Sequence, residues 1–534
     1  MGRGKIQWGA FTKVAGGFVN PERLFMRGRS ATALLLLAAT AFAAVAMASQ
    51  EECAPRKELA AKSFPVDADR VIAMQALASA WAGANGLQVL RPTGIEVAPV
   101  SIRPMPLPRS AYEHVKGLMS GFNEMVHKVS LDADFINREL KPVAVTDDFQ
   151  RHLLEIYNTC REEGVAQPIT LGIFRSDYML HDAGDGSPLV PKQVEINTIA
   201  ASFFGLSQRV TGLHRTLLGR LPLKGLEVTD CPDNSPVSGI ASSIATAIRL
   251  YSKSVQSSNQ HVACLMVVQG DEQNVFDQRH LEFALWDNHQ VPVIRATMAE
   301  IHTGARLDPA SKVLHFQDTE IGCIYFRAGY QPEDYTGQND WDARLLMERS
   351  AAVKCPSAAY HCVGAKKIQA ALARPGVVEK YVSADVAARL RTVFAGMYTL
   401  GDGSVEAREA KEKALAAPKD YVLKPQREGG GNNLYDAEMV QLLSTATDEE
   451  LEAYILMDII KAPVVPSLFM RKGEIFDVKA TTELGIYGTI VAEGGVIHET
   501  QTVGHLLRSK MESSKETGVA AGFGVLDSPA LYDI

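Results

Sequence analysis

The chain has 534 residues, of which 46% are hydrophobic, so it can bury several cores and we expect two or three domains. A formal net charge of −8 argues against a general nucleic-acid-binding protein, which would carry a basic face. Seven cysteines are irregularly spaced without a CxxC pair, which suits reduced thiols better than a disulfide framework or a structural zinc site.

The first 50 residues differ from the rest in composition. Residues 1–30 hold six Lys or Arg and a single acid, and residues 31–48 are uncharged and end in Ala46-Met47-Ala48. The pattern is typical of a signal peptide when read from Met26, and of an organelle presequence when read from Met1. A weak membrane anchor and a mispredicted start codon are the alternatives. We therefore predict a targeting leader over residues 1–50, with plastid, mitochondrial and secretory routes all open.

From about residue 63 onwards the sequence has the patterns of an ordinary globular protein. Apolar residues at helical spacing predict helices over residues 67–86, 112–129 and 149–163. A buried strand follows over residues 171–174. A second strand, residues 192–197, places Glu195 and Asn197 on one face, about 6.6 Å apart. A carboxylate and an amide oxygen at this spacing suit Mg²⁺, although a solvated strand face is the simpler interpretation.

Residues 239–365 have the pattern of a separate α/β unit. A strand at 262–268, a helix at 276–288 and a strand at 291–294 predict a βαβ unit and a parallel sheet. Ligands bind at the carboxyl ends of such strands, which singles out residues 271–278 and Arg327. Arg327 could hold a substrate carboxylate through two hydrogen bonds or form a structural ion pair, and the sequence favours neither.

The most distinctive stretch is Lys-Pro-Gln-Arg-Glu-Gly-Gly-Gly-Asn-Asn-Leu-Tyr, residues 424–435, after a short apolar strand predicted at residues 421–423. Successive glycines let backbone N–H groups approach an anion, and Lys424 and Arg427 add positive charge. The carboxylate of Glu428 makes sense among these groups if a divalent cation lies beside it. The stretch therefore predicts a clamp for nucleotide phosphates with a magnesium ligand, in preference to a mobile surface loop. Downstream, residues 453–459 predict a strand, and residues 483–488 a strand followed by a turn.

Several nucleotide-binding classes lack their motifs in this sequence. There is no GxxxxGK[ST], no HRD with a downstream DFG, no GxGxxG after a strand and no GxSxG. The features that remain are two carboxylates and an amide that could bind a metal, a glycine-rich lid, and scattered Arg and Lys residues. This inventory fits ATP-dependent ligation through an acyl phosphate.

Seven colinear segments resemble the eukaryotic glutathione synthetases: EINTIAASFFGLSQR (195–209), NVFDQR (274–279), YFRAGY (325–330), YVLKPQREGGGNNLY (421–435), TELGIYG (482–488), GHLLRSK (504–510) and GVAAG (518–522). The resemblance implies an α/β ATP-grasp fold with an inserted Rossmann-like parallel-sheet substrate domain and a glycine-rich lid. We expect an N-terminal part of the ATP-grasp body at 51–238, the substrate domain at 239–365 and the C-terminal ATP-grasp part at 366–534.

The resemblance also implies an activity. Such enzymes join γ-glutamylcysteine to glycine, use ATP with Mg²⁺, form an acyl-phosphate intermediate and carry out the second step of glutathione biosynthesis. By family the enzyme would be cytoplasmic and homodimeric, with small-molecule substrates, no nucleic acid and no stable membrane association once the leader is removed.

Site residues carry over from the resemblance position by position. The metal ligands would be Glu195, Asn197 and Glu428, and the catalytic residues Lys366, Glu428 and Arg508. The nucleotide would contact Glu195, Lys366, Lys424, Pro425, Gln426, Arg427, Glu428, Gly429, Gly430, Gly431, Asn432, Asn433, Tyr435, Met457, Asp458, Ile459, Ile460, Glu483, Lys510 and Glu516. The substrates would contact Arg175, Ile199, Ala200, Ala201, Ser202, Glu272, Gln273, Asn274, Gln278, Arg327, Ala328, Gly329, Tyr330, Arg508, Val519 and Ala520.

The sequence departs from the family pattern at a few positions. Ala200 replaces a usual serine, Gln273 an arginine, Ala328 an aspartate, Ile459 a lysine and Glu516 an aspartate. None of these changes removes a predicted metal ligand or a glycine of the lid.

Three functions follow from the resemblance. They are glutathione synthetase itself, a relative that uses β-alanine or another amine, and a catalytically silent binding protein. The small Ala520-Ala521 pair favours glycine as the amine. The complete set of metal ligands argues against the silent homologue.

Overall fold

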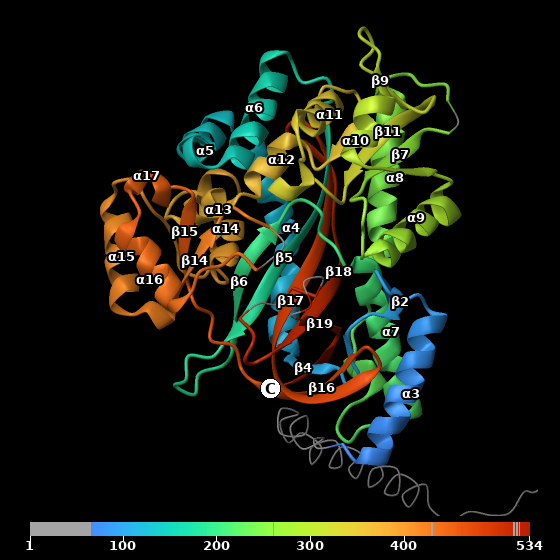
Figure 1. The fold of residues 1–534 in the computed structure, drawn as a ribbon, viewed down its shortest axis with the longest axis vertical. Coiled ribbons are helices and arrows are strands. Elements are labelled where there is room, and N and C mark those ends of the chain that lie inside the picture. The colour runs from blue at the N-terminus through green and yellow to red at the C-terminus, as the bar shows by residue number, and fades with distance from the viewer. Residues whose placement is uncertain are drawn as a thin grey trace, which may run out of the picture. The chain divides into compact units, whose positions relative to one another are not determined.

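A seven-stranded sheet with one parallel pair of neighbours lies at the centre of the structure, which is a computed structural model (Figure 1). The structure describes residues 66–259, 261–428, 431–515, 518, 519, 522 and 524–533, all within one compact unit. The strand order is β16-β3-β19-β18-β17-β5-β6. The strands span Val100–Ser101 (β3), Ile169–His181 (β5), Val190–Asn197 (β6), Val465–Arg471 (β16), Glu474–Glu493 (β17), Val496–Met511 (β18) and Gly524–Asp527 (β19).

The central sheet is apolar on both faces because alternate residues of each strand point to opposite sides. On β17, Tyr487 and Val491 enter one core, whereas Ile486 and Ile490 enter another. Helix α4 (Arg109–Ser130) packs in the second core, and helices α7 (Phe204–Arg220) and α8 (Pro236–Ser254) pack in the first. The sheet is thereby covered by helices on both faces.

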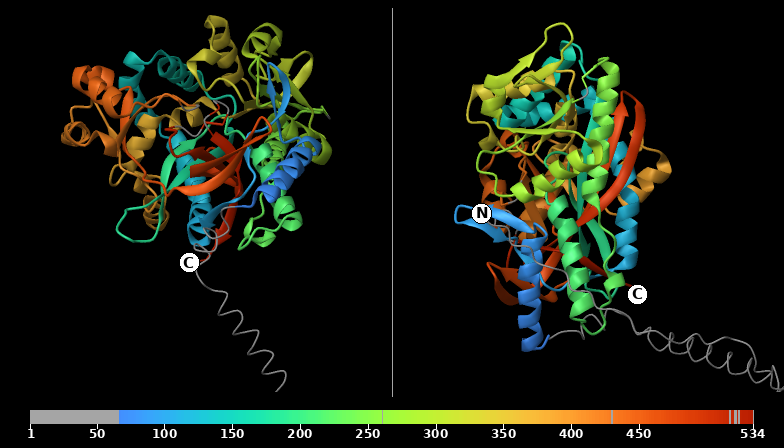
Figure 2. Two further views of the ribbon diagram at one scale, coloured as in Figure 1. Left: turned by 60° about the horizontal axis from the view of Figure 1, so that its bottom comes forward. Right: turned by 90° about the vertical axis from the view of Figure 1, so that its right-hand side faces the viewer.

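A second sheet contains the predicted βαβ unit. Strands β7 (Ala263–Val267), β8 (Val293–Ala296), β11 (Thr319–Phe326) and β12 (Val353–Cys355) pair in parallel, and α9 (Val275–His289) connects the first two. The prediction of a parallel sheet is confirmed. Strands β9 (Ala305–Leu307) and β10 (Leu314–Phe316) extend the sheet in antiparallel fashion. Together with helices α10 (Met298–Gly304) and α11 (Gln338–Glu348), it forms the yellow-green group of Figures 1 and 2.

A third, smaller sheet forms the orange group in Figure 1. Its order is β13-β15-β14, all antiparallel, with bounds Met397–Thr399, Tyr454–Asp458 and Tyr421–Pro425. Helices α15 (Val405–Ala416), α16 (Asp436–Thr445) and α17 (Asp448–Leu451) belong to the same group and share a core with the sheet. The predicted strands at 421–423 and 453–459 are confirmed here.

The remaining elements surround these sheets. Strands β1 (Gln88–Arg91) and β2 (Gly94–Val97) form a hairpin, and β4 (Met105–Pro108) pairs in parallel with β20 (Pro529–Tyr532). The other helices are α3 (Ala68–Ala84), α5 (Ala133–Thr146), α6 (Asp148–Glu162), α12 (Ala358–Val363), α13 (Lys366–Ala373) and α14 (Ala384–Arg391). No helix among the described residues is long and apolar enough to span a membrane. The predicted leader, residues 1–50, lies outside the described residues.

Most predicted elements are present, with one correction in the central sheet. Helices α3, α4 and α6 match the three N-terminal predictions. The turn predicted at residues 483–488 is wrong, because β17 continues through Gly488 to Glu493. A Cβ on Gly488 would lie 2.5 Å from Oδ1 of Asn123 on α4, so this glycine allows close packing rather than a turn. The domain boundaries proposed from the sequence stay predictions.

Candidate active site

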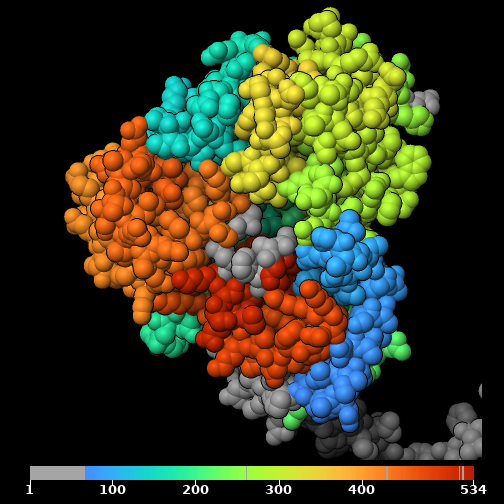
Figure 3. All heavy atoms as spheres, viewed as in Figure 1, coloured from blue at the N-terminus to red at the C-terminus, as the bar shows by residue number. Residues whose placement is uncertain are grey.

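A cavity of about 650 Å³ lies where the three sheets meet. Figure 3 shows the surface hollowed between the groups of elements that carry these sheets. Strands β5, β6, β17 and β18 supply one wall, the loops after β7 and β11 supply the second, and strands β14 and β15 supply the third. Residues from distant parts of the chain therefore converge on one space.

Most of the predicted site residues line this cavity. They are Arg175, Glu195, Asn197, Ile199, Ala200, Ser202, Glu272, Gln273, Asn274, Arg327, Tyr330, Lys366, Lys424, Arg427, Glu428, Asn432, Asn433, Tyr435, Met457, Asp458, Ile459, Ile460, Glu483, Arg508, Lys510 and Val519. Gly429, Gly430, Glu516 and Ala520 lie outside the described residues. The structure thus brings together both predicted sets, the nucleotide set and the substrate set.

Seven predicted residues do not line the cavity: Ala201, Gln278, Ala328, Gly329, Pro425, Gln426 and Gly431. Gln426 is buried, and its side-chain oxygen accepts a hydrogen bond of 3.0 Å from the backbone N–H of Lys367. Gln278 is also buried and donates to the carboxylate of Glu272. Gln278 thus supports a cavity residue, whereas Gln426 contacts Lys367, the neighbour of the lining residue Lys366, and neither amide lines the cavity itself.

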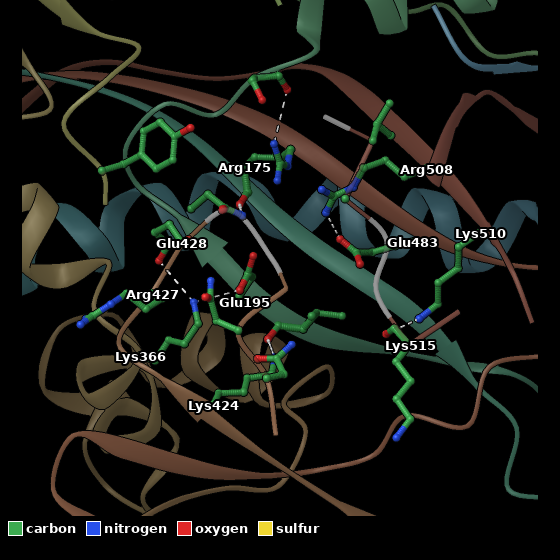
Figure 4. Close-up of a pocket in the computed structure, with 18 of the residues that line it drawn as sticks. Arg175, Glu195, Lys366, Lys424, Arg427, Glu428, Glu483, Arg508, Lys510 and Lys515 are labelled. Carbon is green, nitrogen blue, oxygen red and sulfur yellow. Dashed lines mark hydrogen bonds and ion pairs between the residues drawn. The ribbon is translucent and has the colours of Figure 1, made fainter. Parts of the chain in front are cut away.

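A lysine and two carboxylates form the charged centre of the cavity (Figure 4). Lys366 begins α13, and its Nζ lies 3.1 Å from Oε2 of Glu195 and 3.3 Å from Oε1 of Glu428. Burial raises the pKa of Glu428 to about 7, despite the nearby ammonium of Lys366. Burial also opposes ionisation of Glu195, but Lys366 and Lys424 outweigh it and hold its pKa at about 2. Burial favours neutral Lys366, but the two carboxylates outweigh it and raise its pKa above the usual range.

The predicted metal ligands suit a hard cation. Asn197 donates from its Nδ2 to Oδ2 of Asp177 at 3.0 Å, so its amide oxygen is free to face elsewhere. Lys366 already places one positive charge between the carboxylates of Glu195 and Glu428. Among the described residues, no three His, Cys, Asp or Glu side chains converge as a metal site. A cation here would therefore need Asn197 and oxygen atoms of a bound ligand in addition to the two carboxylates.

The neighbouring strands β17 and β18 contribute paired charges. Glu483 and Arg508 are opposite each other in the register and form an ion pair. Lys510 is two residues further on, and its Nζ donates to the backbone oxygen of Lys515 at 2.7 Å. Figure 4 shows Arg175 and Arg508 close together in the same wall. This wall is thus suited to anionic groups of a ligand.

The loops after the parallel strands carry the other predicted substrate residues. Arg327 follows β11 and forms a buried ion pair with Asp277, with NH1 3.1 Å from Oδ2. Asp277 also accepts from the backbone N–H of Phe203 at 2.8 Å and of Gly205 at 2.7 Å. The structural ion pair considered for Arg327 is therefore present, and the same residue also lines the cavity.

The glycine-rich stretch forms a loop with a fixed base. Backbone N–H groups of Leu423 and Leu434 each donate to the other's oxygen, at 3.0 and 2.9 Å. Above this base, Arg427 forms an ion pair with Asp147, the residue that caps the start of α6. The loop is therefore held at its two ends and at one point along its length.

Sequence reasoning missed several lining residues. They are Met179, Val194, Phe203, Gln269, Lys419, Val422, Asp436, Lys515 and Gly518. Asp271 also lines the cavity, and it belongs to the loop at residues 271–278 that the sequence singled out. It also missed Asp177, a buried carboxylate on β5 that contacts Arg175, Asn197 and Arg508. Strand alternation could have indicated Asp177, since it lies two residues from Arg175 and so on the same face.

Comparisons with known proteins agree with this geometry. A family model described as the eukaryotic glutathione synthase ATP-binding domain matches residues 68–531. The glutathione synthetase of Dictyostelium discoideum is 42% identical over 469 residues, covering 84% of this chain and 97% of that protein. The human protein is 42% identical over 445 residues, covering 82% and 91%. The chloroplastic protein of Solanum lycopersicum is 39% identical over 437 residues, covering 81% and 77%.

A solved structure shows the same fold. The glutathione synthetase-like effector of Globodera pallida, in its apo form, aligns with a TM-score of 0.69 at 21% identity, covering 88% of this chain and 98% of that one. The expected ATP-grasp architecture is thereby supported from structure as well as sequence. The chain belongs to the eukaryotic glutathione synthetase family.

Proposed function

We propose that this chain is an ATP-dependent ligase that joins γ-glutamylcysteine to glycine, with release of ADP and phosphate. Family membership supports the reaction, and the Glu195–Lys366–Glu428 centre is the observation that carries it to this chain. In that centre a lysine and two carboxylates lie between a wall suited to a nucleotide and walls suited to anionic substrates. Phosphoryl transfer depends on positioning and on cations that offset the developing negative charge, and this centre can supply both.

The nucleotide would bind along the third sheet. Met457, Asp458, Ile459 and Ile460 line the cavity at and just beyond the end of β15, while Lys424 lines it from neighbouring β14. The glycine-rich loop would then cover the phosphates as a lid, exclude water and protect an acyl phosphate from hydrolysis. Proteolysis of this loop should slow when nucleotide binds, and equal cleavage rates with and without nucleotide would contradict the lid role.

The dipeptide would bind between the central sheet and the parallel sheet. Arg175 and Ser202 line the cavity on one side, and Arg327 and Tyr330 line it on the other. Arginine side chains hold carboxylates through paired hydrogen bonds, and γ-glutamylcysteine carries two carboxylates. The carboxylate of its cysteinyl residue accepts the γ-phosphoryl group of ATP, and the glycine amine then displaces phosphate.

Glu195, Asn197 and Glu428 would hold Mg²⁺. When bound, the ion screens the negative charge of the ATP phosphates that the acyl carboxylate must approach. Lys366 is placed to donate to a phosphate oxygen near these ligands. Arg508 is placed to stabilise the negative charge that develops on the acyl phosphate.

One assay separates the three possible functions. ADP release with γ-glutamylcysteine would be compared with glycine, with β-alanine and without an amine. We expect turnover with glycine, because the family is defined by glutathione synthesis. Faster turnover with β-alanine would identify the relative with another amine preference. ADP release with no amine acceptor would show a ligase uncoupled from its second step, and no turnover with any amine would favour the silent binding protein.

We further propose a homodimer. Exposed apolar side chains lie on neighbouring elements, namely Ile72 on α3, Ile95 on β2, and Phe283 and Trp286 on α9, each at least half exposed. Burial of such a patch against a second copy would remove apolar surface from water. Light scattering should give the mass of a dimer, and Trp286→Lys should shift the protein towards the monomer.

The leader would deliver the enzyme to an organelle and be removed there. A chloroplastic relative supports this proposal, as do the cationic residues 1–30 and the uncharged run that follows them. Mass spectrometry of the protein from its own cells should find an N-terminus near residue 49. An intact Met1 would contradict removal of the leader.

A further inference from the structure

We infer that Asp177 is a positioning residue that sets the orientation of a magnesium ligand and of two substrate-side arginines at once. The inference rests on the proposed function of the cavity. Asp177 lies on β5 and is completely buried, with Glu195 opposite it on β6 and Gly485 opposite it on β17. The residue does not line the cavity itself, so its effect on the reaction must pass through its neighbours.

The first neighbour is Arg175. Its Nε lies 2.7 Å from Oδ1 of Asp177, and its NH2 lies 2.8 Å from Oδ2. Such a two-point contact fixes the plane of the guanidinium as well as its position. The remaining nitrogen, NH1, is 3.4 Å from the backbone oxygen of Ser202, at the edge of the cavity. Asp177 therefore determines which nitrogen of Arg175 is available to a ligand.

The second neighbour is Arg508. Its NH2 lies 3.2 Å from Oδ2 of Asp177 and also contacts Glu483. Without Asp177, the guanidinium groups of Arg175 and Arg508 would share one buried region with less compensating negative charge. Asp177 thus allows two cations to be kept close together in the wall of the site.

The third neighbour is Asn197, a proposed metal ligand. Its Nδ2 donates to Oδ2 of Asp177 at 3.0 Å and to the backbone oxygen of Arg175 at 3.3 Å. Both partners are acceptors, so the amide can satisfy them only with its NH₂ group. Its oxygen must then face away from them, which is the orientation that a metal ion needs.

The neighbouring strand β17 has a glycine, Gly485, opposite Asp177, and a side chain at this position would collide with the ion pair between Asp177 and Arg175. A Cβ at Gly485 would lie 2.6 Å from Oδ1 of Asp177 and 2.7 Å from Cδ of Arg175. Real side chains do not tolerate such contacts, so a residue other than glycine would displace the ion pair. Gly485 therefore provides a second way to disturb the same contacts without removing the carboxylate.

The test uses Asp177→Asn in the full-length protein. An asparagine at this position can offer its own NH₂ to Asn197, which would turn the Asn197 oxygen inward. Calorimetry would measure ADP binding at a series of Mg²⁺ concentrations and in EDTA. In the wild-type protein Mg²⁺ should increase the affinity for ADP. In the variant, the Mg²⁺ concentration that gives half of this increase should rise at least about tenfold, as is usual when a residue that orients a metal ligand is lost. The affinity for ADP in EDTA should not change. The KM for γ-glutamylcysteine should rise at least about tenfold, whereas the KM for ATP at saturating Mg²⁺ changes less.

Two further variants make the test decisive. Gly485→Ala should shift the Mg²⁺ dependence and the KM for γ-glutamylcysteine in the same directions. Ser176→Ala is the matched control on β5, because strand alternation places this residue on the face opposite Arg175 and Asp177, where its hydroxyl accepts from Gln193 on β6. The control should lower the stability of the protein but leave both the Mg²⁺ dependence of ADP binding and the KM for γ-glutamylcysteine unchanged.

Several outcomes would overturn the inference. One is an unchanged Mg²⁺ dependence of ADP binding in a folded Asp177→Asn protein. Another is a Ser176→Ala control that shifts the Mg²⁺ dependence and the KM for γ-glutamylcysteine as much as Asp177→Asn does. If Asp177→Asn fails to fold, unchanged values of both parameters in Gly485→Ala would overturn the inference. Failure of the proposed function looks different, because wild-type protein would then release no ADP with γ-glutamylcysteine and glycine. Calorimetry with Mg²⁺ and ADP would still test Asp177 in that case.

Discussion

Lys366 and Glu428 are 62 positions apart in the sequence, yet Nζ of the lysine lies 3.3 Å from Oε1 of the glutamate. The lysine begins α13, which packs against strands β13 and β15 of the third sheet, and the glutamate follows β14 of that sheet. The same ammonium lies 3.1 Å from Glu195 of the central sheet. One buried cation therefore connects the glycine-rich loop to the strand that carries the other two proposed metal ligands.

Replacing Lys366 by methionine should separate its two roles. Without the ammonium, the carboxylates of Glu195 and Glu428 face each other unscreened, so a divalent cation should bind the free protein more tightly. Turnover should nevertheless fall about 100-fold or more, as expected when a contact to developing charge is lost. Calorimetry with Mn²⁺ and steady-state kinetics at saturating ATP would check both effects. Weaker metal binding together with normal turnover would contradict this role of the lysine.

Glu428→Gln should lower turnover far more than stability. Burial raises the pKa of Glu428 to about 7, so the site does not strongly favour the charged form, and a neutral amide of the same shape should be accepted. The amide is a poorer ligand for Mg²⁺ than a carboxylate. Thermal melting without ligands should match the wild-type protein, and turnover should fall about 100-fold or more. An unfolded variant, or a fully active one, would show that Glu428 has no metal role.

The lid should loosen when its contact with α6 is weakened. Arg427 pairs with Asp147, which also caps α6 by accepting from the backbone N–H of Gln150 at 3.0 Å. Asp147→Asn keeps an acceptor for the cap but removes the charge. We expect faster proteolysis within residues 424–435 in the absence of nucleotide and a KM for ATP raised by about two- to tenfold.

A matched control exists one helix earlier. Asp132 caps α5 through the same geometry, accepting from the backbone N–H of Phe135 at 2.9 Å, and its other oxygen accepts from the hydroxyl of Tyr381 at 2.8 Å and not from any described residue of the glycine-rich loop. Asp132→Asn should leave the cleavage rate of the loop unchanged. Equal effects of the two variants would mean that helix capping, and not the contact with Arg427, controls the loop.

Local patterns predicted those parts of the fold in which one segment determines its own structure. The βαβ unit was predictable because its strands are buried on both faces and read as continuous apolar runs, as residues 262–268 do. The glycine-rich loop was predictable because its charges and glycines are adjacent in the sequence. Glu195 and Asn197 were predictable as a pair because strand alternation alone places them on one face.

Features that depend on long-range packing were not predictable. The 20-residue strand β17 contains two glycines, and only contacts with distant residues show why they stand inside a strand, because a Cβ on Gly488 would meet Asn123 and a Cβ on Gly485 would meet Asp177. Lys419 and Lys515 have no local pattern that marks them as lining residues. Strand alternation could have indicated Asp177 beside Arg175, but no local pattern predicts its contact with Arg508, which is 331 positions away in the sequence.

The pH dependence of stability should report on a buried histidine far from the reaction. His214 is completely buried on α7, with Nε2 2.8 Å from the backbone oxygen of Ser101 and Nδ1 2.6 Å from the hydroxyl of Ser528. The carbonyl of Ser101 can only accept, so Nε2 carries the proton and Nδ1 accepts from Ser528. The folded protein thus holds the ring neutral, and burial lowers the pKa of His214 to about 4.

The sign of the effect follows from linkage. An unfolded chain protonates this histidine near pH 6.5, whereas the folded protein does so only near pH 4, so stability is lost as the pH falls through this interval. His214→Gln should be less stable at pH 7.5, because it loses the fitted ring. Its free energy of unfolding, measured by urea titration, should nevertheless fall less steeply between pH 6.5 and 4.5 than that of the wild-type protein. The two slopes should differ by up to about 1.4 kcal/mol per pH unit. Parallel curves for the two proteins would show that His214 takes a proton as readily in the folded state as in the unfolded one.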